Sequence, residues 1–246
     1  LVGSEMCIRD REYKEHLTGQ PPVCDVALLL PSSWWWCHPD WQWPQRTYHL
    51  GLELRDRMDY EIVDELMMRD GALHRLGIRV AVLAEGTFFE ARALEALRAW
   101  VEAGGILVLA GVDSLTDTEG RTEVSTALLA SEDGIGALGR GCVIHLQGKS
   151  TADRRAQNDR IVELVYRLSE EVPGKADAVL VDDQTDAIEC TLLPDRVLFY
   201  NTGPSFVRKI VRFRENDFPP GSARPPAWEI ELEIPAHSIR AIRLAP

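Results

Sequence analysis

Residues 78–110 read IRVAVLAEGTFFEARALEALRAWVEAGGILVLA and contain a complete strand–helix–strand unit. The apolar runs 78–83 and 106–110 are typical of buried strands, and the segment between them has the apolar spacing of an amphipathic helix. The side chains expected to face the core are Ala93, Leu94, Leu97, Trp100 and Val101. Gly104-Gly105 is expected to end this helix. The unit therefore predicts two adjacent parallel strands joined by a right-handed crossover.

The start of the same helix carries a second signal. Thr87-Phe88-Phe89-Glu90 has the capping-box pattern, with threonine at the N-cap and glutamate at N3. The pattern predicts that the helix begins directly after Thr87.

Other segments of the first half alternate in the same way. Strands are predicted at 26–30, 60–63 and 142–146. A helix is predicted from the recurrence of Tyr48, Leu50, Leu54 and Met58, and another from 155 to 170 with Ile161, Val162, Leu164, Val165 and Leu168 inward. Between Gly111 and Gly141 we expect a loop with one short helix at 127–130. These elements predict a five-stranded, doubly wound parallel sheet at residues 23–172.

The pattern changes to alternating strands after Pro173-Gly174-Lys175, which we interpret as a hinge. Strands are predicted at 187–193, 196–200, 207–213, 228–234 and 238–244, with an exposed loop at 216–226. Pro194-Asp195 is a hairpin signal. Residues 173–246 are therefore expected to form a small antiparallel β-sandwich.

Gly134-Ile135-Gly136-Ala137-Leu138-Gly139 matches the G-x-G-x-x-G dinucleotide fingerprint. That motif needs a strand before it and a helix after it, so that the phosphates meet a helix N-terminus. Here a predicted strand follows instead. We interpret these glycines as shaping a turn into strand 142–146 and expect no cofactor.

Five tryptophans follow the strand 26–30 within ten residues. They are Trp34, Trp35, Trp36, Trp41 and Trp43. Indole rings stack on sugar faces, and they are equally common in cores and interfaces. The sequence leaves both interpretations open: a carbohydrate-binding or interface loop, or a closed core.

Composition limits the partners and the compartment. A net charge of −12 and a pI near 5.0 argue against nucleic acid. Cys24, Cys37, Cys142 and Cys190 are scattered without a CxxC pair, which favours free thiols and a cytoplasmic location. Cys37-His38 with Asp40 lacks the spaced ligand pairs of a zinc site, so no metal is expected. No apolar run is long enough to cross a membrane.

Residues 1–11, beginning LVGSEMCIRD, resemble a translated sequencing adapter, and 12–22 are expected to be a linker. We therefore expect the natural N-terminus to lie upstream.

Three stretches carry a family resemblance: Val26–Leu30, Ala99–Gly105 and the closing Glu233–Ile239. In this order they resemble the C-terminal half of β-galactosidases of glycoside hydrolase family 42. The resemblance covers about residues 23–246, and its motifs are generic. It implies a flavodoxin-like, class I glutamine-amidotransferase-like trimerisation domain followed by a β-sandwich. It also implies an upstream catalytic barrel in the same chain and a homo-oligomer.

The resemblance implies that this chain is a non-catalytic accessory and assembly region of a larger glycoside hydrolase, and two enzyme functions are alternatives to this role. Active amidotransferases place a cysteine nucleophile after the strand equivalent to 106–110, where this chain has Gly111-Val112-Asp113-Ser114. Cys142 lies within a strand, and Ser114 lacks a G-x-S-x-G elbow. Glycoside hydrolysis needs two carboxylates, for which the weak candidates are Glu85 and Asp113, with Asp64 and Glu65 nearby. Solvated or helix-capping roles are favoured for these carboxylates, and a stand-alone carbohydrate-binding module remains an alternative.

Overall fold

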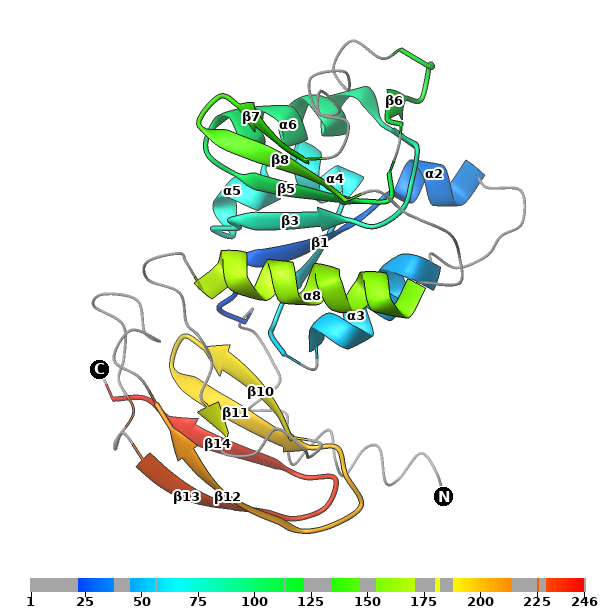
Figure 1. The fold of residues 1–246 in the computed structure, drawn as a ribbon. Coiled ribbons are helices and arrows are strands. Elements are labelled where there is room, and N and C mark those ends of the chain that lie inside the picture. The colour runs from blue at the N-terminus through cyan, green and yellow to red at the C-terminus, as the bar shows by residue number, and fades with distance from the viewer. Residues whose placement is uncertain are drawn as a thin grey trace, which may run out of the picture. The chain divides into compact units, whose positions relative to one another are not determined.

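A computed structural model describes residues 22–37, 45–55, 57–112, 114–121, 134–146, 154–170, 180–181, 188–213, 225 and 229–245 (Figure 1). The adapter-like segment, the proposed hinge at 173–175, the short helix at 127–130 and most of loop 216–226 lie outside these ranges. The chain divides into two compact units, one at 24–171 and one that contains Val23 and residues 172–246. No helix of the described residues is long and apolar enough to cross a membrane.

The first unit is built on a six-stranded sheet. Its strands are β1 (Val26–Leu30), β2 (Glu61–Asp64), β3 (Val80–Leu83), β5 (Ile106–Ala110), β7 (Gly134–Leu138) and β8 (Gly141–Leu146). Their order is β2-β1-β3-β5-β8-β7, in which the first five are mutually parallel and β7 runs antiparallel to β8. The predicted parallel sheet is confirmed. The prediction of five strands is wrong, because the glycine-rich β7 lacks the apolar run that marks a buried strand.

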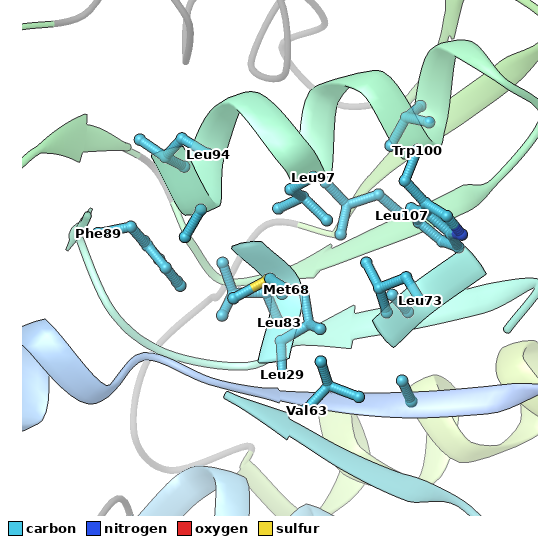
Figure 2. Packing of buried hydrophobic residues seen from close by; sticks show 14 of the residues in the cluster. Leu29, Val63, Met68, Leu73, Leu83, Phe89, Leu94, Leu97, Trp100 and Leu107 are labelled. Carbon is cyan, nitrogen blue, oxygen red and sulfur yellow. The ribbon is translucent and has the colours of Figure 1, made fainter. Parts of the chain in front are cut away.

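Helices cover both faces of this sheet (Figure 1). On one face lie α4 (Glu65–Arg69), α5 (Ala72–Arg75) and α6 (Ala91–Glu102), and on the other α3 (Gln45–Arg55) and α8 (Arg154–Glu170). Figure 2 shows the first core, in which side chains of α4, α5 and α6 pack on Leu29, Leu83 and Leu107 of the sheet. Each large apolar side chain buried in this way contributes about 1.5–3 kcal/mol.

Helix α6 has the predicted inward face, since all five expected side chains are buried. Trp100 donates its indole N–H to the carbonyl of Ile78, so its polar atom is satisfied inside the core. Gly105 lies against the ring of Trp100, where a Cβ would come within 2.5 Å of it. The glycine that follows the helix is therefore required by packing on its own tryptophan.

The capping-box prediction is wrong. Phe88–Phe89 form the short strand β4, which pairs with β6 (Thr116–Asp117), and α6 begins only at Ala91. Glu90 occupies the N-cap and makes no side-chain cap bond. Phe89 is fully buried in the first core. Burial of this ring keeps the segment extended, which outweighs the local capping preference.

Helix α3 also departs from the predicted face. Leu50 and Leu54 are buried as expected, but Tyr48 is 57% exposed and Met58 lies buried beyond the end of the helix. Tyr48 and Leu50 are two residues apart, so they point to different sides of a helix. In α8, by contrast, Ile161, Val162 and Val165 are buried and Leu164 and Leu168 are half-buried, which confirms its predicted inward face.

The G-x-G-x-x-G segment forms an antiparallel hairpin with β8. Gly139 adopts φ 62° in the two-residue turn Gly139-Arg140, and the backbone N–H of Arg140 donates to the carbonyl of Glu102 at the end of α6. A Cβ on Gly139 would lie 2.5 Å from that same carbonyl oxygen. The strand β8 follows the motif, which confirms the predicted turn into this strand.

The second unit consists of two three-stranded antiparallel sheets. One has the order β10 (Ile188–Leu193), β11 (Arg196–Asn201), β14 (Ile239–Arg243), and the other the order β13 (Glu229–Ile234), β12 (Val207–Arg212), β9 (Leu180–Val181). Both contribute to one core, with Phe199 and Ile242 from the first sheet and Val211 and Ile234 from the second. The predicted antiparallel strands and the Pro194-Asp195 turn are confirmed.

Gly141 offers a test of how the hairpin docks. A Cβ there would overlap the carbonyl oxygens of Val101 and Gly105, which are backbone atoms that cannot swing away. We expect Gly141→Ala to lower the free energy of unfolding by about 2–3 kcal/mol, measured by urea denaturation. Gly120→Ala is the control, because its Cβ meets nothing and only its φ of 81° opposes the change, at about 1–2 kcal/mol. Equal losses for the two variants would contradict tight docking.

Candidate functional site

Three of the five clustered tryptophans occupy a helix rather than the expected loop. Residues Ser32–Cys37 form α2, directly after β1 at the carboxyl end of the sheet. Trp34 and Trp35 are half-buried, and Trp36 is 63% exposed. The ring centroids of Trp35 and Trp36 are 5.2 Å apart with an interplanar angle of 34°. Trp41 and Trp43 lie outside the described residues. The three described rings thus belong to neither a closed core nor a fully open platform.

Helix α2 is held by one buried carboxylate. Glu65, which is 2% exposed, accepts hydrogen bonds from the backbone N–H of Ser33 at 2.6 Å and from its hydroxyl at 2.7 Å. It also accepts from the backbone N–H of Glu90 at 2.6 Å, at the N-cap of α6. Hydrogen bonds to an ionised acceptor are about twice as strong as neutral ones. Glu65 therefore ties the tryptophan helix, the end of β2 and the start of α6 together.

The other described carboxylates at this edge also meet helix N-termini. Asp64 accepts from the backbone N–H of Met67 at 2.8 Å and caps α4. Glu85, which follows β3, accepts from the backbone N–H of Thr47 at 2.9 Å, in the first turn of α3. Asp113 lies outside the described residues. Each described candidate thus neutralises a helix dipole, which matches the helix-capping interpretation.

The loops after β1 and β3 touch at the point where the strand order reverses. In open α/β sheets this switch point is where ligands bind. Here Gly86, at φ 103°, lies so close to Pro31 that a Cβ would come within 2.6 Å of the proline ring. The backbone of Gly86 therefore packs on the side chain of Pro31. In nucleotide-binding folds of this type, the cofactor binds at this position.

The turn after β5 carries no nucleophile elbow. Gly111 has φ 70°, and the guanidinium of Arg46 lies against it, 2.5 Å from where a Cβ would stand. Ser114 is exposed, and the short strand β6 follows instead of a helix. His145 of β8 donates through Nε2 to the carbonyl of Val112 at 2.7 Å. His145, which contacts this turn, is therefore bonded to backbone.

Two thiols are chemically unsuited to act as nucleophiles. Burial, aided by the carboxylates of Glu61 and Asp25, raises the pKa of the Cys24 thiol to about 12. Burial also raises the pKa of Cys142 in β8. A thiolate is the reactive form of cysteine, so both side chains are held in the unreactive protonated state near neutral pH. Within the described residues, no group of three or more His, Cys, Asp or Glu side chains is placed to hold a metal ion.

The fold is similar to parts of several solved glycoside hydrolases. A catalytic mutant of a GH42 β-galactosidase from G. stearothermophilus matches with a TM-score of 0.61 and 12% identity, over 93% of this chain and 41% of that protein. The β-galactosidase from Rahnella sp. R3 matches with 0.60 and 11%, over 92% and 41%. A rhamnosidase from Novosphingobium sp. matches with 0.53 and 15%, over 92% and 23%. No protein-family model matches, and no curated protein matches in sequence. The chain therefore spans less than half the length of these structural relatives.

The role of Glu65 can be measured by comparison with its neighbour. We expect Glu65→Ala to lower the free energy of unfolding by at least about 2 kcal/mol, because it leaves three donors without their acceptor. Asp64→Ala removes one cap bond and should cost about 1 kcal/mol. Urea denaturation followed by tryptophan fluorescence gives both values. A smaller loss for Glu65→Ala than for Asp64→Ala would show that Glu65 does not hold these segments.

Thiol reactivity tests the electrostatics of the same unit. At pH 8 only about one Cys24 side chain in ten thousand is a thiolate, whereas Cys37 is exposed at the end of α2. Iodoacetamide should therefore modify Cys37 in the folded protein and Cys24 only after denaturation, as read by peptide mass spectrometry. Equal labelling rates in the folded state would mean that the pKa of the Cys24 thiol is not raised as described.

Proposed function

We propose that this chain is a non-catalytic accessory and assembly region of a larger β-galactosidase-like glycoside hydrolase. The supporting observation is that the described carboxylates at the ligand edge, Asp64, Glu65 and Glu85, all accept hydrogen bonds from helix N-termini. A glycosidase needs one free acid and one free nucleophile or base. This chain matches only 41% of the length of the β-galactosidases that it resembles, which supports the proposal that it is one part of a larger enzyme.

We also propose the domain assignment that the resemblance to family 42 β-galactosidases implies. The α/β unit corresponds to a flavodoxin-like, amidotransferase-like trimerisation domain, and the second unit to the C-terminal β-sandwich. The catalytic barrel lies upstream in the same polypeptide, and the whole protein is a cytoplasmic homo-oligomer. Two observations favour a scaffold role rather than amidotransferase activity. The described residues of the turn at Gly111 form no nucleophile elbow, and the pKa values of the Cys24 and Cys142 thiols are raised.

Genomic sequence upstream of Arg11 is the most direct test. A reading frame for a catalytic barrel of about 250 residues, continuous with this chain, would support the proposal. An in-frame stop codon, or an unrelated upstream domain, would overturn it.

Activity of the isolated chain is the second test. We expect residues 1–246 to hydrolyse no chromogenic β-galactoside, because Asp64, Glu65 and Glu85 at the sheet edge are bonded to backbone donors. A turnover that disappears in Glu85→Gln and persists in Glu95→Gln, a helix-surface control on α6, would make the sheet edge catalytic instead.

Carbohydrate binding at α2 is a second candidate, favoured by the exposed indole of Trp36 beside Trp35. In the whole enzyme these rings would face a barrel active site, where each stacking contact on a sugar is worth about 0.5–1.5 kcal/mol. Saccharide-induced quenching of fluorescence should then weaken in Trp36→Ala without a change in melting temperature. Trp34→Ala, at a half-buried position, is the comparison. If no sugar alters the fluorescence of the parent, α2 is not a sugar site in this fragment.

A further inference from the structure

Strand β7 closes one end of the six-stranded sheet as an edge without charge. Its sequence is Gly-Ile-Gly-Ala-Leu, and within the described residues no strand pairs with its outer side (Figure 1). Natural edge strands are usually protected by lysine, proline or a bulge. β7 has neither lysine nor proline, and Ile135 is 72% exposed. Such an edge can receive another strand.

The hydrogen-bonding direction of each residue in β7 follows from the hairpin register. Leu138 faces Gly141 across the two-residue turn, Gly136 faces Val143 and Gly134 faces His145. In antiparallel pairs the bonded positions alternate, and the pair that closes a two-residue turn is a bonded one. Gly134, Gly136 and Leu138 therefore bond to β8. The backbone N–H and C=O of Ile135 and Ala137 point away from β8, towards the open edge.

This pattern is self-complementary about Gly136. If a second β7 pairs antiparallel with that residue at the centre, Ile135 faces Ala137 of the partner subunit, and Leu138 faces Gly134 of the partner subunit. A large side chain meets a small one in both of these pairs, and at the centre Gly136 faces Gly136 of the partner subunit. Ile135 and Ala137, whose backbone groups point outward, would each face the other residue of the partner strand. Each of these two pairs can form two backbone hydrogen bonds, so four bonds would form across the two-fold axis.

The opposite edge of the same sheet lacks this property. β2 reads Glu-Ile-Val-Asp, so self-pairing would place Glu61 against Asp64 of the partner subunit, in a protein that already carries a net charge of −12. Like charges directly opposite each other destabilise a strand pair. Exposed apolar residues alone do not distinguish the two edges, since Ile62 of β2 is also 54% exposed.

The β7 edge is also held in a fixed conformation. The Gly139-Arg140 turn bonds to the last turn of α6, and Cys142 donates its backbone N–H to the carbonyl of Gly105. Beside Ile135, the cross-strand neighbour Ile144 is buried in the core under α8. Association would therefore cost little ordering of the strand, and Ile135 would extend an existing apolar face.

We propose that a second copy of this chain docks on β7 through antiparallel pairing centred on Gly136, joining two sheets into one. The inference does not depend on the proposed function, because it concerns the isolated chain and needs no catalytic partner. A five-residue strand contact is small, so the dimer belongs to the weak class of interfaces.

Sedimentation velocity of residues 1–246 at roughly 10–300 μM is the first measurement, since weak interfaces are populated there. We expect a monomer–dimer equilibrium that added salt does not weaken, because the contact carries no ion pair and salt screens the net negative charge. A strictly monomeric chain over this range would overturn the proposal.

Variants then identify the edge. Ile135→Lys places a charge in the contact, and Ala137→Pro removes one outward N–H per copy while proline remains tolerated on an edge strand. Each should weaken the dimer at least about tenfold, or about 1.4 kcal/mol. Ile62→Lys, the matched exposed isoleucine on β2, should leave the dimer unchanged. Loss of the dimer in Ile62→Lys with its retention in Ile135→Lys would overturn the proposal.

Amide hydrogen exchange of the parent protein gives an answer even if a variant fails to fold. The amides of Ile135 and Ala137 should become protected as the protein concentration rises, whereas the amide of Ile62 should not change. Protection of the Ile135 and Ala137 amides that does not change with protein concentration would overturn the proposal.

Discussion

The carboxylate of Glu65 satisfies donors from three segments that are far apart in sequence. It lies at the end of β2, accepts two hydrogen bonds from Ser33 in α2, and accepts one from the N-cap residue of α6. A charge with 2% exposure is stable in a protein interior only if such donors surround it. The positions of the tryptophan helix and of the central crossover helix therefore depend on one side chain.

At the carboxyl edge of the sheet, the protein's own carboxylates lie where ligands bind in other open α/β sheets. The carboxyl edge of an open parallel sheet presents helix N-termini, which attract anions. In this chain Asp64, Glu65 and Glu85 meet the first turns or N-caps of α4, α2, α6 and α3. Pro31 packs on Gly86 at the switch point itself. The described part of the edge is thus stabilised by the protein's own side chains.

The sequence correctly predicted the elements that are marked by regularly spaced apolar residues along a whole strand or helix. The strands β1, β3 and β5 and the inward face of α6 were all found where the apolar spacing placed them. Two predictions from local signals were wrong. Thr87 does not cap a helix, because burial of Phe89 draws the segment into β4, and Trp34, Trp35 and Trp36 lie in a helix instead of a loop. Strand β7 was missed because two of its five residues are glycine.

The sequence by itself determined the class of the fold, a parallel sheet with helices on both sides followed by antiparallel strands, because burying apolar faces requires these periods. It also identified the acidic residues at the carboxyl edge. Only the tertiary structure decided what those acids do, since Ser33 and Glu90 reach Glu65 across 32 and 25 residues. Likewise, the open side of β7 exists only once the hairpin is docked on α6. Such contacts join distant segments, and no local pattern encodes which donor will meet which acceptor.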